Sequence, residues 1–466
     1  MLPVVARTFA RIQERLLGRR TFAILKELEE SQWWPRDRIA ALQLDRLRDL
    51  AATAYEHAPY WRALMNERGI SPGDLQTLDD LRRFPLLEKA TLRERREEMV
   101  WREEGPRVKL IRTSGSTNEA LQFYTSSSRE AAINAARIRG HRWIGVNKGD
   151  KEVYFWGSPV ELHAQDRIKR LRDWLVNEPL SDGFEITEER AARYIEDWKR
   201  WRPKCIFGYP NTFLLTVQMA RKAGIDLKEV GRRGTRLLCT TSEMLGEVNR
   251  KIISEAFGLP VYDSFGLREA ALVGHECDRF TMHTTDEHVI LETIDPQTLE
   301  PTGGEGELVV TSLISRVMPI IRYRTGDIVT LSNEPCACGR SLGCLTISGG
   351  RIADFVVTRQ GKWVAGYFLI YICRGVPGIV KFQAVQDRVG EVRVSLVTDA
   401  QFPADGCDRV KAAVQARLAS DDEIAVQVVD DIAPAPSGKY RPVIGNLAEA
   451  LRSEGRTKPC GMRNPT

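Results

Sequence analysis

The chain has 466 residues, of which 42% are hydrophobic and 28% are charged. This is the composition of an ordinary globular protein, and the length predicts roughly two to four domains, or one large domain with a smaller one. The net charge of +5 is small for this length, and no long basic tract occurs, so the sequence gives no support for a nucleic-acid partner.

The first 20 residues, MLPVVARTFARIQERLLGRR, are basic and amphipathic. They lack the long apolar core of a signal peptide or membrane span, so a helix packed on the body is favoured over a membrane-surface or targeting segment. No run approaches about 18 apolar residues, and we expect a soluble protein without stable membrane insertion. Nine cysteines without a secretory signal predict a reducing, cytoplasmic location.

Residues 32–99 are predicted to be helical. The run LQLDRLRDLAATAYEHAPYWRALM places apolar residues three and four positions apart, which is typical of amphipathic helices. The following run, SPGDLQTLDDLRRFPLL, predicts short helices that are capped by Ser and Thr and broken by Pro.

A loop of small hydroxyl and glycine residues, Thr113–Thr117 (TSGST), lies between two strand-like runs, LIR and ALQFYT. Its amides and hydroxyls can surround a phosphate or another oxyanion. The loop is not a GxxxxGK[ST] phosphate loop, because no GK[ST] follows it. Taken alone, it is equally compatible with an ordinary hairpin loop.

From residue 107 to residue 347, strand-like and helix-like segments alternate, which predicts an α/β domain with a mainly parallel sheet. Strands are expected at 151–157, 202–210, 235–243 and 260–266, and helices at 211–224 and 247–258. Loops at the carboxyl ends of parallel strands commonly carry the functional site. Here these ends read GYPN, TTSE and DSFGLRE, which are polar and contain glycine.

The last part of the chain has a different pattern. Segments 391–399 and 423–432 read as strands, and 407–420 reads as an amphipathic helix. We therefore expect a large domain at 1–350, including the N-terminal helical segment, and a small mobile α+β domain at 351–466. The hinge is predicted at Gly349–Asp354 (GGRIAD).

Five further motifs follow the hydroxyl loop in order: TTSEML (240–245), DSFGLREA (263–270), RYRTGDIV (322–329), GGRIAD (349–354) and PSGKYRPVI (436–444). With this set, the sequence resembles the adenylate-forming acyl-CoA synthetase superfamily. Within that superfamily, it is most similar to the phenylacetate-CoA ligase branch and its capsule-biosynthesis relatives. The resemblance extends from about Gln32 to about Ile444.

The resemblance implies that a carboxylate attacks ATP to form an acyl-adenylate, and that a second nucleophile, usually the thiol of coenzyme A, then displaces AMP. ATP, Mg²⁺ and coenzyme A are therefore the expected cofactors. Both steps develop charge that fixed donors and a cation must stabilise.

The resemblance also implies roles for individual residues. Lys439 matches the mobile lysine of the small domain, Glu269 the Mg²⁺ ligand, and Asp327 the ribose-binding carboxylate. The family's phosphate-binding loop is matched by Thr113, Ser114, Gly115, Ser116 and Thr117. The segments that bracket adenine are matched by Ser242, Glu243, Asp263, Ser264, Phe265 and Gly266, and the arginine at the domain junction is matched by Arg351.

Two departures from the family pattern matter. Asn118 and Glu119 stand where Gly and Lys usually follow the hydroxyl loop, and an acidic side chain beside a triphosphate is unfavourable unless it turns away. Arg268 replaces the usual Thr before Glu269, and its guanidinium can pair with a phosphate oxygen instead. Each matched residue also has an ordinary structural interpretation, such as a turn cap for Asp327.

The cysteines predict a structural zinc site. Cys277 and His283 lie in HECDRFTMH, and Cys336 and Cys338 lie in EPCACG. Three thiolates and one imidazole form a standard tetrahedral donor set, and clustered cysteines in a reducing compartment indicate metal more often than disulfides. His275 and Cys344 are the alternative ligands, and free buried cysteine is the ordinary alternative for each residue.

The acid-binding pocket is expected to include Phe155, Trp156, Gly157, Phe207, Gly208, Tyr209 and Pro210. Aromatic residues beside glycines suit an aryl or arylacetyl acid, although the same aromatics can be core residues. The acceptor can also be an amine, in a natural-product or polysaccharide pathway. A weakly catalytic, zinc-stabilised binding protein is the alternative from another class, and the sequence leaves open whether the protein forms a homodimer.

Overall fold

The computed structural model describes residues 1–105, 107–112, 121–156, 167–183, 186–296, 298–351, 355–360, 363–365, 367–418, 421–432 and 442–445. The chain divides into two compact units. The first contains Met1–Leu291, Val309–Arg324 and Ser332–Leu345, and the second contains Glu292–Leu308, Thr325–Leu331 and Thr346–Thr466. Each unit is described by itself.

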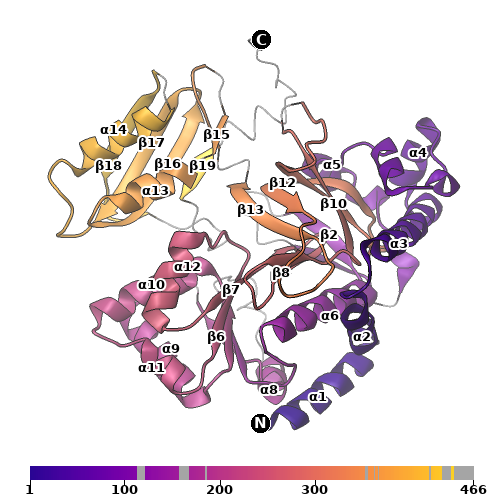
Figure 1. Cartoon of the computed structure of the whole chain (residues 1–466), viewed down its shortest axis with the longest axis horizontal. Coiled ribbons are helices and arrows are strands. Elements are labelled where there is room, and N and C mark those ends of the chain that lie inside the picture. Colours follow the sequence, from indigo (N-terminus) through magenta and orange to yellow (C-terminus); the bar gives the residue numbers. More distant parts are fainter. Residues whose placement is uncertain are drawn as a thin grey trace. The chain divides into compact units, whose positions relative to one another are not determined.

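Helices form the beginning of the first unit, shown in indigo and purple in Figure 1. They are α1 (Pro3–Leu16), α2 (Thr21–Ser31), α3 (Arg36–His57), α4 (Pro59–Glu67) and α5 (Lys89–Glu94), with short 3-10 helices at Pro72–Asp74, Leu78–Arg83, Arg96–Glu98 and Arg102–Glu104. Apolar residues at helical spacing bring one face of α3 and α4 into a core around Trp61 and Phe84. The predicted helical character of residues 32–99 is confirmed.

Eleven of the described strands form a large sheet in the order β10-β11-β12-β13-β9-β8-β7-β6-β5-β3-β4. The strands are β3 (Glu152–Trp156), β4 (Leu180–Asp182), β5 (Cys205–Gly208), β6 (Leu237–Thr241), β7 (Val261–Leu267), β8 (Ala271–Glu276), β9 (Met282–Thr284), β10 (Val289–Ile294), β11 (Glu305–Ser312), β12 (Ile320–Ser332) and β13 (Cys344–Arg351). A separate antiparallel hairpin, β1 (Lys109–Arg112) and β2 (Gln122–Thr125), flanks the predicted hydroxyl loop.

Strands β4, β3, β5, β6 and β7 are parallel neighbours, whereas β8 and β9 add antiparallel pairs. The central strands β5 and β6 are buried at every position, as expected for parallel strands that are covered on both faces. Their alternate residues pack on one side against α9 (Glu188–Trp201), α10 (Pro210–Lys222) and α12 (Glu247–Phe257). The helices α8 (Arg167–Leu175) and α11 (Lys228–Arg232) complete this region. The predicted α/β class is confirmed.

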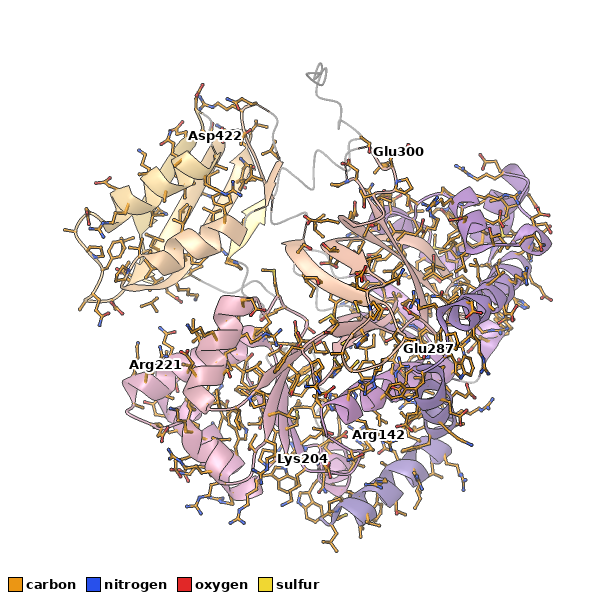
Figure 2. All side chains as sticks on the ribbon, viewed as in Figure 1. Arg142, Lys204, Arg221, Glu287, Glu300 and Asp422 are labelled. Carbon is orange, nitrogen blue, oxygen red and sulfur yellow. The ribbon has the colours of Figure 1, made fainter. Side chains whose placement is uncertain are left out.

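A buried ion pair holds α6 (Ser127–Trp143) to the neighbouring parts of the first unit. The guanidinium of Arg139 donates to both carboxylate oxygens of Glu287, at 2.6 and 3.2 Å, and also to the carbonyl of Leu28 in α2 at 3.1 Å. The hydroxyl of Ser31 donates to the same carboxylate. Figure 2 labels Glu287, and it labels Arg142, which lies on α6 one turn from Arg139.

The second unit contains a four-stranded sheet in the order β18-β17-β16-β19. Its described elements are α13 (Tyr367–Gly375), β16 (Ile379–Arg388), β17 (Glu391–Thr398), α14 (Gly406–Leu418), β18 (Glu423–Val428) and β19 (Val443–Gly445), with a small hairpin of β14 (Phe355–Val357) and β15 (Trp363–Ala365). Alternate strand residues and one face of α14 share a core. The predicted small α+β domain with its own sheet is confirmed.

None of the described helices is long and apolar enough to cross a membrane.

Candidate active site and metal centre

The two segments predicted to bracket adenine lie next to each other. Strands β6 and β7 are parallel neighbours, and Thr241 pairs with Ser264 in their register. The chain turns immediately after β6, because Ser242 has a left-handed backbone with φ of 69°. The carboxylate of Glu243 then accepts a hydrogen bond of 3.2 Å from the amide of Asn211, at the start of α10. Both segments therefore meet at the carboxyl edge of the parallel strands.

Asp263 is buried at this edge and is held by specific hydrogen bonds. Its carboxylate accepts from the hydroxyl of Thr240 at 2.6 Å and from the amide of Ser264 at 3.0 Å. Burial raises the pKa of Asp263 to about 7, against the lowering effect of the Thr240 hydroxyl. Behind it, Glu276 accepts the amide of Asp263 at 2.8 Å and pairs with Arg250. This network fixes the backbone of β7 where the DSFG segment begins.

Glu269, the predicted Mg²⁺ ligand, lies in the turn between β7 and β8. Its carboxylate accepts a hydrogen bond of 3.2 Å from the hydroxyl of Tyr323 in β12. The side chain is only partly buried, so oxygen lone pairs remain that suit a hard cation such as Mg²⁺. Arg268, on the preceding position, is exposed.

The turn that carries Glu269 is anchored by Arg129, for which the sequence motifs predict no role. Ser126 caps α6, which places Arg129 in the first helical turn. The guanidinium of Arg129 donates to the carbonyl of Arg268 at 2.7 Å, and it also contacts Ser315 at 2.9 Å and Thr125 at 3.2 Å.

Arg129 is buried, with 2% of its surface exposed. Burial lowers the pKa of Arg129 to about 10, and the nearby charge of Glu269 opposes that shift, so the guanidinium stays charged at neutral pH. A single Arg in the run SSSRE gives no signal of this role, because the contact joins residues 139 positions apart.

Asp327, the predicted ribose-binding residue, lies in the second unit on β12. It is buried, and its amide donates to the hydroxyl of Thr325 at 3.0 Å. The amide of Gly326 donates to the buried carboxylate of Glu307 at 3.2 Å. This part of β12 is therefore held by the side chain of Thr325 and by Glu307 of β11.

Several predicted residues lie outside the described part of the chain. They are Thr113, Ser114, Gly115, Ser116, Thr117, Asn118, Glu119, Gly157 and Lys439, together with the side chain of Arg351. Their assigned roles stay predictions from the sequence motifs.

The aromatic residues predicted for the acid pocket point to opposite faces of the sheet. Phe155 is fully buried among Tyr194, Trp198 and Phe213, with ring centroids 5.0–5.9 Å apart, which fits the core alternative. On the other face, Trp156 lies 5.3 Å from Phe207 and 4.9 Å from Tyr209.

Gly208 and Pro210 lie where β5 ends and α10 begins. A Cβ at Gly208 would lie 2.6 Å from the carbonyl oxygen of Phe155, so glycine permits β3 and β5 to approach there. Pro210 is the first residue of α10, a position that suits its fixed φ and missing amide proton.

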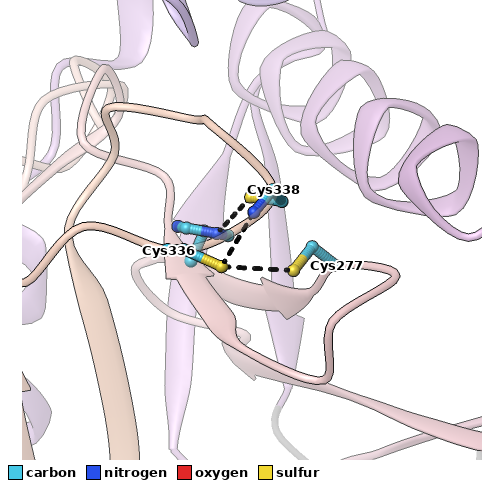
Figure 3. Close-up of side chains that lie close together, drawn as sticks. Cys277, Cys336 and Cys338 are labelled. Atoms are coloured by element: carbon cyan, nitrogen blue, oxygen red, sulfur yellow. Dashed lines mark hydrogen bonds between the residues drawn. The ribbon is translucent and has the colours of Figure 1, made fainter.

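The predicted metal ligands Cys277, His283, Cys336 and Cys338 come together. One donor atom from each lies within 4.8 Å of the others. The sulfurs of Cys277 and Cys336 are 3.9 Å apart, and Nε2 of His283 lies 3.1 Å from the sulfur of Cys338. Figure 3 shows the three cysteine side chains facing a common point. The spacing fits a tetrahedral ion with bonds of about 2.0–2.3 Å.

The surroundings of these ligands also suit a metal ion. Nδ1 of His283 lies 3.4 Å from the carbonyl of Leu342, which favours Nε2 as the ligating atom. Burial lowers the pKa of His283, so the ring is neutral, as a ligand must be. The amide of Arg279 donates to the sulfur of Cys277 at 3.3 Å. Of the alternative ligands, Cys344 lies 3.8 Å from His283, whereas His275 groups with His141 and Cys239.

Comparison with known proteins gives related sequences and folds. The phenylacetate-coenzyme A ligase of Thermus thermophilus is 30% identical over 345 residues, which cover 71% of this chain and 74% of that protein. Protein CapK of Staphylococcus aureus is 23% identical over 416 residues, covering 87% and 89% of the two chains. Residues 356–446 match the family described as the CapK C-terminal domain.

A solved structure of 2-hydroxyisobutyryl-CoA ligase in complex with 2-HIB-AMP has the same fold. Its TM-score is 0.72 at 21% identity, and the match covers 92% of this chain and 96% of that chain. The similarity to phenylacetate-coenzyme A ligases over about 70% of the chain places it in the class of ATP-dependent, AMP-forming acid ligases. Within that class, the chain belongs to the phenylacetate-CoA ligase family.

Proposed function

We propose that the protein activates a carboxylic acid as an acyl-adenylate with ATP and then transfers the acyl group to coenzyme A. The observation that supports this most directly is the 30% identity to a phenylacetate-coenzyme A ligase over 345 residues, a region that contains the predicted adenine and Mg²⁺ segments. An aryl or arylacetyl acid is the favoured substrate, because Trp156, Phe207 and Tyr209 offer flat apolar surface on one face of the sheet.

The proposed mechanism assigns charge stabilisation to fixed groups. Glu269 would hold the Mg²⁺ that neutralises the phosphates of ATP, and the hydroxyl loop Thr113–Thr117 would surround them. Asp327 would accept hydrogen bonds from the ribose hydroxyls, and Ser242 to Glu243 and Asp263 to Gly266 would border adenine. Lys439 would place a positive charge beside the reacting phosphorus and the acid.

Product analysis tests this function. With ATP, Mg²⁺, coenzyme A and a suitable acid, we expect equal amounts of AMP, pyrophosphate and acyl thioester. Formation of ADP and phosphate would contradict the proposal. Replacing coenzyme A with an amine such as glycine tests the alternative acceptor, and faster amide than thioester formation would favour an amide ligase.

Arg129 is proposed as a positioning residue for the Mg²⁺ ligand. In Arg129→Lys, the ammonium keeps the charge but cannot reach Arg268, Ser315 and Thr125 together, so the turn before Glu269 loses its anchor. We expect the Mg²⁺ concentration for half-maximal activity to rise about 10- to 100-fold, as for other residues that orient metal ligands.

A magnesium titration at saturating acid measures this effect, and thermal unfolding reports the stability of each variant. The matched control is Arg142→Lys, because Arg142 lies on the same helix and pairs with Glu29 instead. An unchanged Mg²⁺ dependence in folded Arg129→Lys would show that Arg129 only supports the core.

We also propose that Cys277, His283, Cys336 and Cys338 hold a structural Zn²⁺. Four protein donors complete a tetrahedral shell, so the ion would have no open position for substrate. It would tie the loop after β12 to β8 and β9, which are the strands that follow the Glu269 turn.

Purified protein is therefore expected to contain about one zinc per chain. Cys338→Ser should lose the metal and unfold at lower temperature, whereas Cys407→Ser, in α14 of the second unit, should keep it. Elemental analysis together with thermal unfolding makes the measurement. A metal-free wild-type protein that is fully folded would overturn the zinc assignment.

A further inference from the structure

A second cluster of metal-binding side chains lies inside the first unit and shares no residue with the four predicted zinc ligands. His141 on α6, Cys239 on β6 and His275 on β8 each place one donor atom within 4.8 Å of the other two. All three side chains are buried. Two imidazoles and a thiol are donors that zinc commonly binds, so the cluster is a candidate for a second ion.

Hydrogen bonding leaves Nε2 of each histidine with a lone pair. Nδ1 of His275 lies 2.8 Å from the carbonyl oxygen of Glu276, which can only accept, so Nδ1 carries the proton. Nε2 of His275 then lies 3.8 Å from the sulfur of Cys239. Nδ1 of His141 lies 2.9 Å from the carboxylate of Glu152, which holds the proton on Nδ1 in the same way. Histidines that bind metals typically give their other nitrogen to a carboxylate or a carbonyl.

Nε2 of His141 has no hydrogen-bond partner among the residues that the structure describes. His141 is only 3% exposed, so water does not readily reach this nitrogen. Buried polar atoms are nearly always bonded, and one that is not needs an explanation such as an ion at the site. A metal bound between the three donors would supply the missing interaction.

The fold makes room for the imidazole of His275 beside α6. Gly140 lies inside this helix, where glycine is less favourable than alanine. A Cβ at Gly140 would lie 2.5 Å from two ring atoms of His275, a distance that a side chain could not tolerate. Glycine at this position therefore allows the ring from β8 to approach the helix that carries His141.

The separation of the donors fits an ion between them. Bonds of about 2.0 Å to nitrogen and about 2.3 Å to sulfur, at angles of about 109–120°, place the two donors about 3.5–3.7 Å apart. The observed distance between Nε2 of His275 and the sulfur of Cys239 is 3.8 Å. A weak S–H···N hydrogen bond is the ordinary alternative, but it would leave Nε2 of His141 without a partner.

Net charge does not decide what the cluster binds. The charged groups that act on its members are Glu152, Asp263, Glu276, Arg137, Arg139 and Lys148. Most of them have partners: Glu276 pairs with Arg250, Arg139 with Glu287, and Lys148 with Glu178. The charges therefore largely balance, and the type and geometry of the donors would select the ion.

We propose that His141, Cys239 and His275 form a second metal site that binds Zn²⁺, with Glu152 and the carbonyl of Glu276 orienting the two imidazoles. Three protein ligands leave a fourth position for water, so the site should hold zinc more weakly than the four-ligand site. The ion would tie α6 to β6 and β8. Because the closed site accounts for the zinc expected in purified protein, the second ion would bind when zinc is added.

Equilibrium dialysis of the whole 466-residue protein against buffered free Zn²⁺, followed by elemental analysis, counts the ions. We expect about two zinc ions per chain in the wild type and about one in Cys239→Ser and in His141→Gln. The two variants remove different ligands from different elements, so the proposal stays testable if one of them does not fold. The measured quantity is the difference of one ion, which does not depend on whether the first site is filled.

Thermal unfolding gives a second measurement. Added Zn²⁺ should raise the unfolding temperature of the wild type and leave that of Cys239→Ser nearly unchanged, because an ion that binds only the folded state stabilises it. The matched control is Cys205→Ser, which removes another fully buried cysteine from the neighbouring strand β5, outside the cluster. This variant should keep the second ion and the rise in unfolding temperature.

The same experiment can contradict the proposal in two ways. Equal zinc content in the wild type, Cys239→Ser and His141→Gln would show that the cluster binds no zinc. Loss of the ion in Cys205→Ser to the same extent would assign the effect to a disturbed sheet core and would also overturn the proposal. Cys338→Ser, which lacks a ligand of the first site, should still differ from its double variant with Cys239→Ser by one ion.

Discussion

Replacement of Lys439 by Ala is expected to lower the rate of adenylate formation by about 10²–10³-fold, the usual effect of removing a group that stabilises transition-state charge. Lys439 lies in the motif PSGKYRPVI, which matches the segment that carries the family's mobile lysine. A lysine ammonium is a compact charge that a glycine-flanked loop can bring to the reacting phosphorus. The rate of thioester formation from supplied acyl-adenylate should stay nearly unchanged.

The comparison of the two half-reactions makes this prediction specific. A damaged fold would slow both steps, whereas loss of a transition-state charge slows only the first. Lys411→Ala removes an exposed lysine from α14 of the same unit and should affect neither step. Equal losses in both half-reactions of Lys439→Ala would contradict the assigned role.

Replacement of Arg139 by Met is expected to lower the free energy of unfolding by about 3–5 kcal/mol, because removal of one partner leaves a buried charge uncompensated. The side chains of Arg139 and Glu287 are each only 1% exposed. The pair also joins α2 through Leu28 and Ser31, so its loss affects contacts between distant segments. Urea unfolding followed by tryptophan fluorescence measures the change.

Two further variants separate charge from packing. The double variant Arg139→Met, Glu287→Leu removes both charges and should recover most of the stability, since apolar replacement of a whole buried pair is often neutral. Arg142→Met breaks a pair with Glu29 whose side chains are 29% and 34% exposed, and it should cost less than about 1 kcal/mol. Equal costs for Arg139→Met and Arg142→Met would contradict the account.

Local pattern was sufficient to predict much of the fold. Strands β3, β5, β6 and β7 and helices α10 and α12 follow from apolar runs that alternate with Gly- and Pro-marked turns, and β17, α14 and β18 follow from clear periodicity. The elements α8, β4, α9 and α11 were not predicted. The clustering of Cys277, His283, Cys336 and Cys338 was also predictable, because cysteine and histidine at short spacing indicate a common site in a reducing compartment.

Long-range contacts of common residue types were not predictable. Arg129 and Arg139 are two arginines among many charged residues, and their roles arise from partners more than 100 positions away. The burial of Phe155 is explained by local pattern instead, because successive side chains along β3 point to opposite faces of the sheet and that of Phe155 points into the core.

The central claim is that an acyl-adenylate forms before any acceptor reacts, and ATP–pyrophosphate exchange tests it most directly. Folded wild-type protein with Mg²⁺ would be assayed without coenzyme A across aryl, arylacetyl, fatty and dicarboxylic acids. We predict exchange of labelled pyrophosphate into ATP that depends on the acid and needs no coenzyme A. Absence of exchange with every acid, or exchange that is independent of acid, would contradict the account.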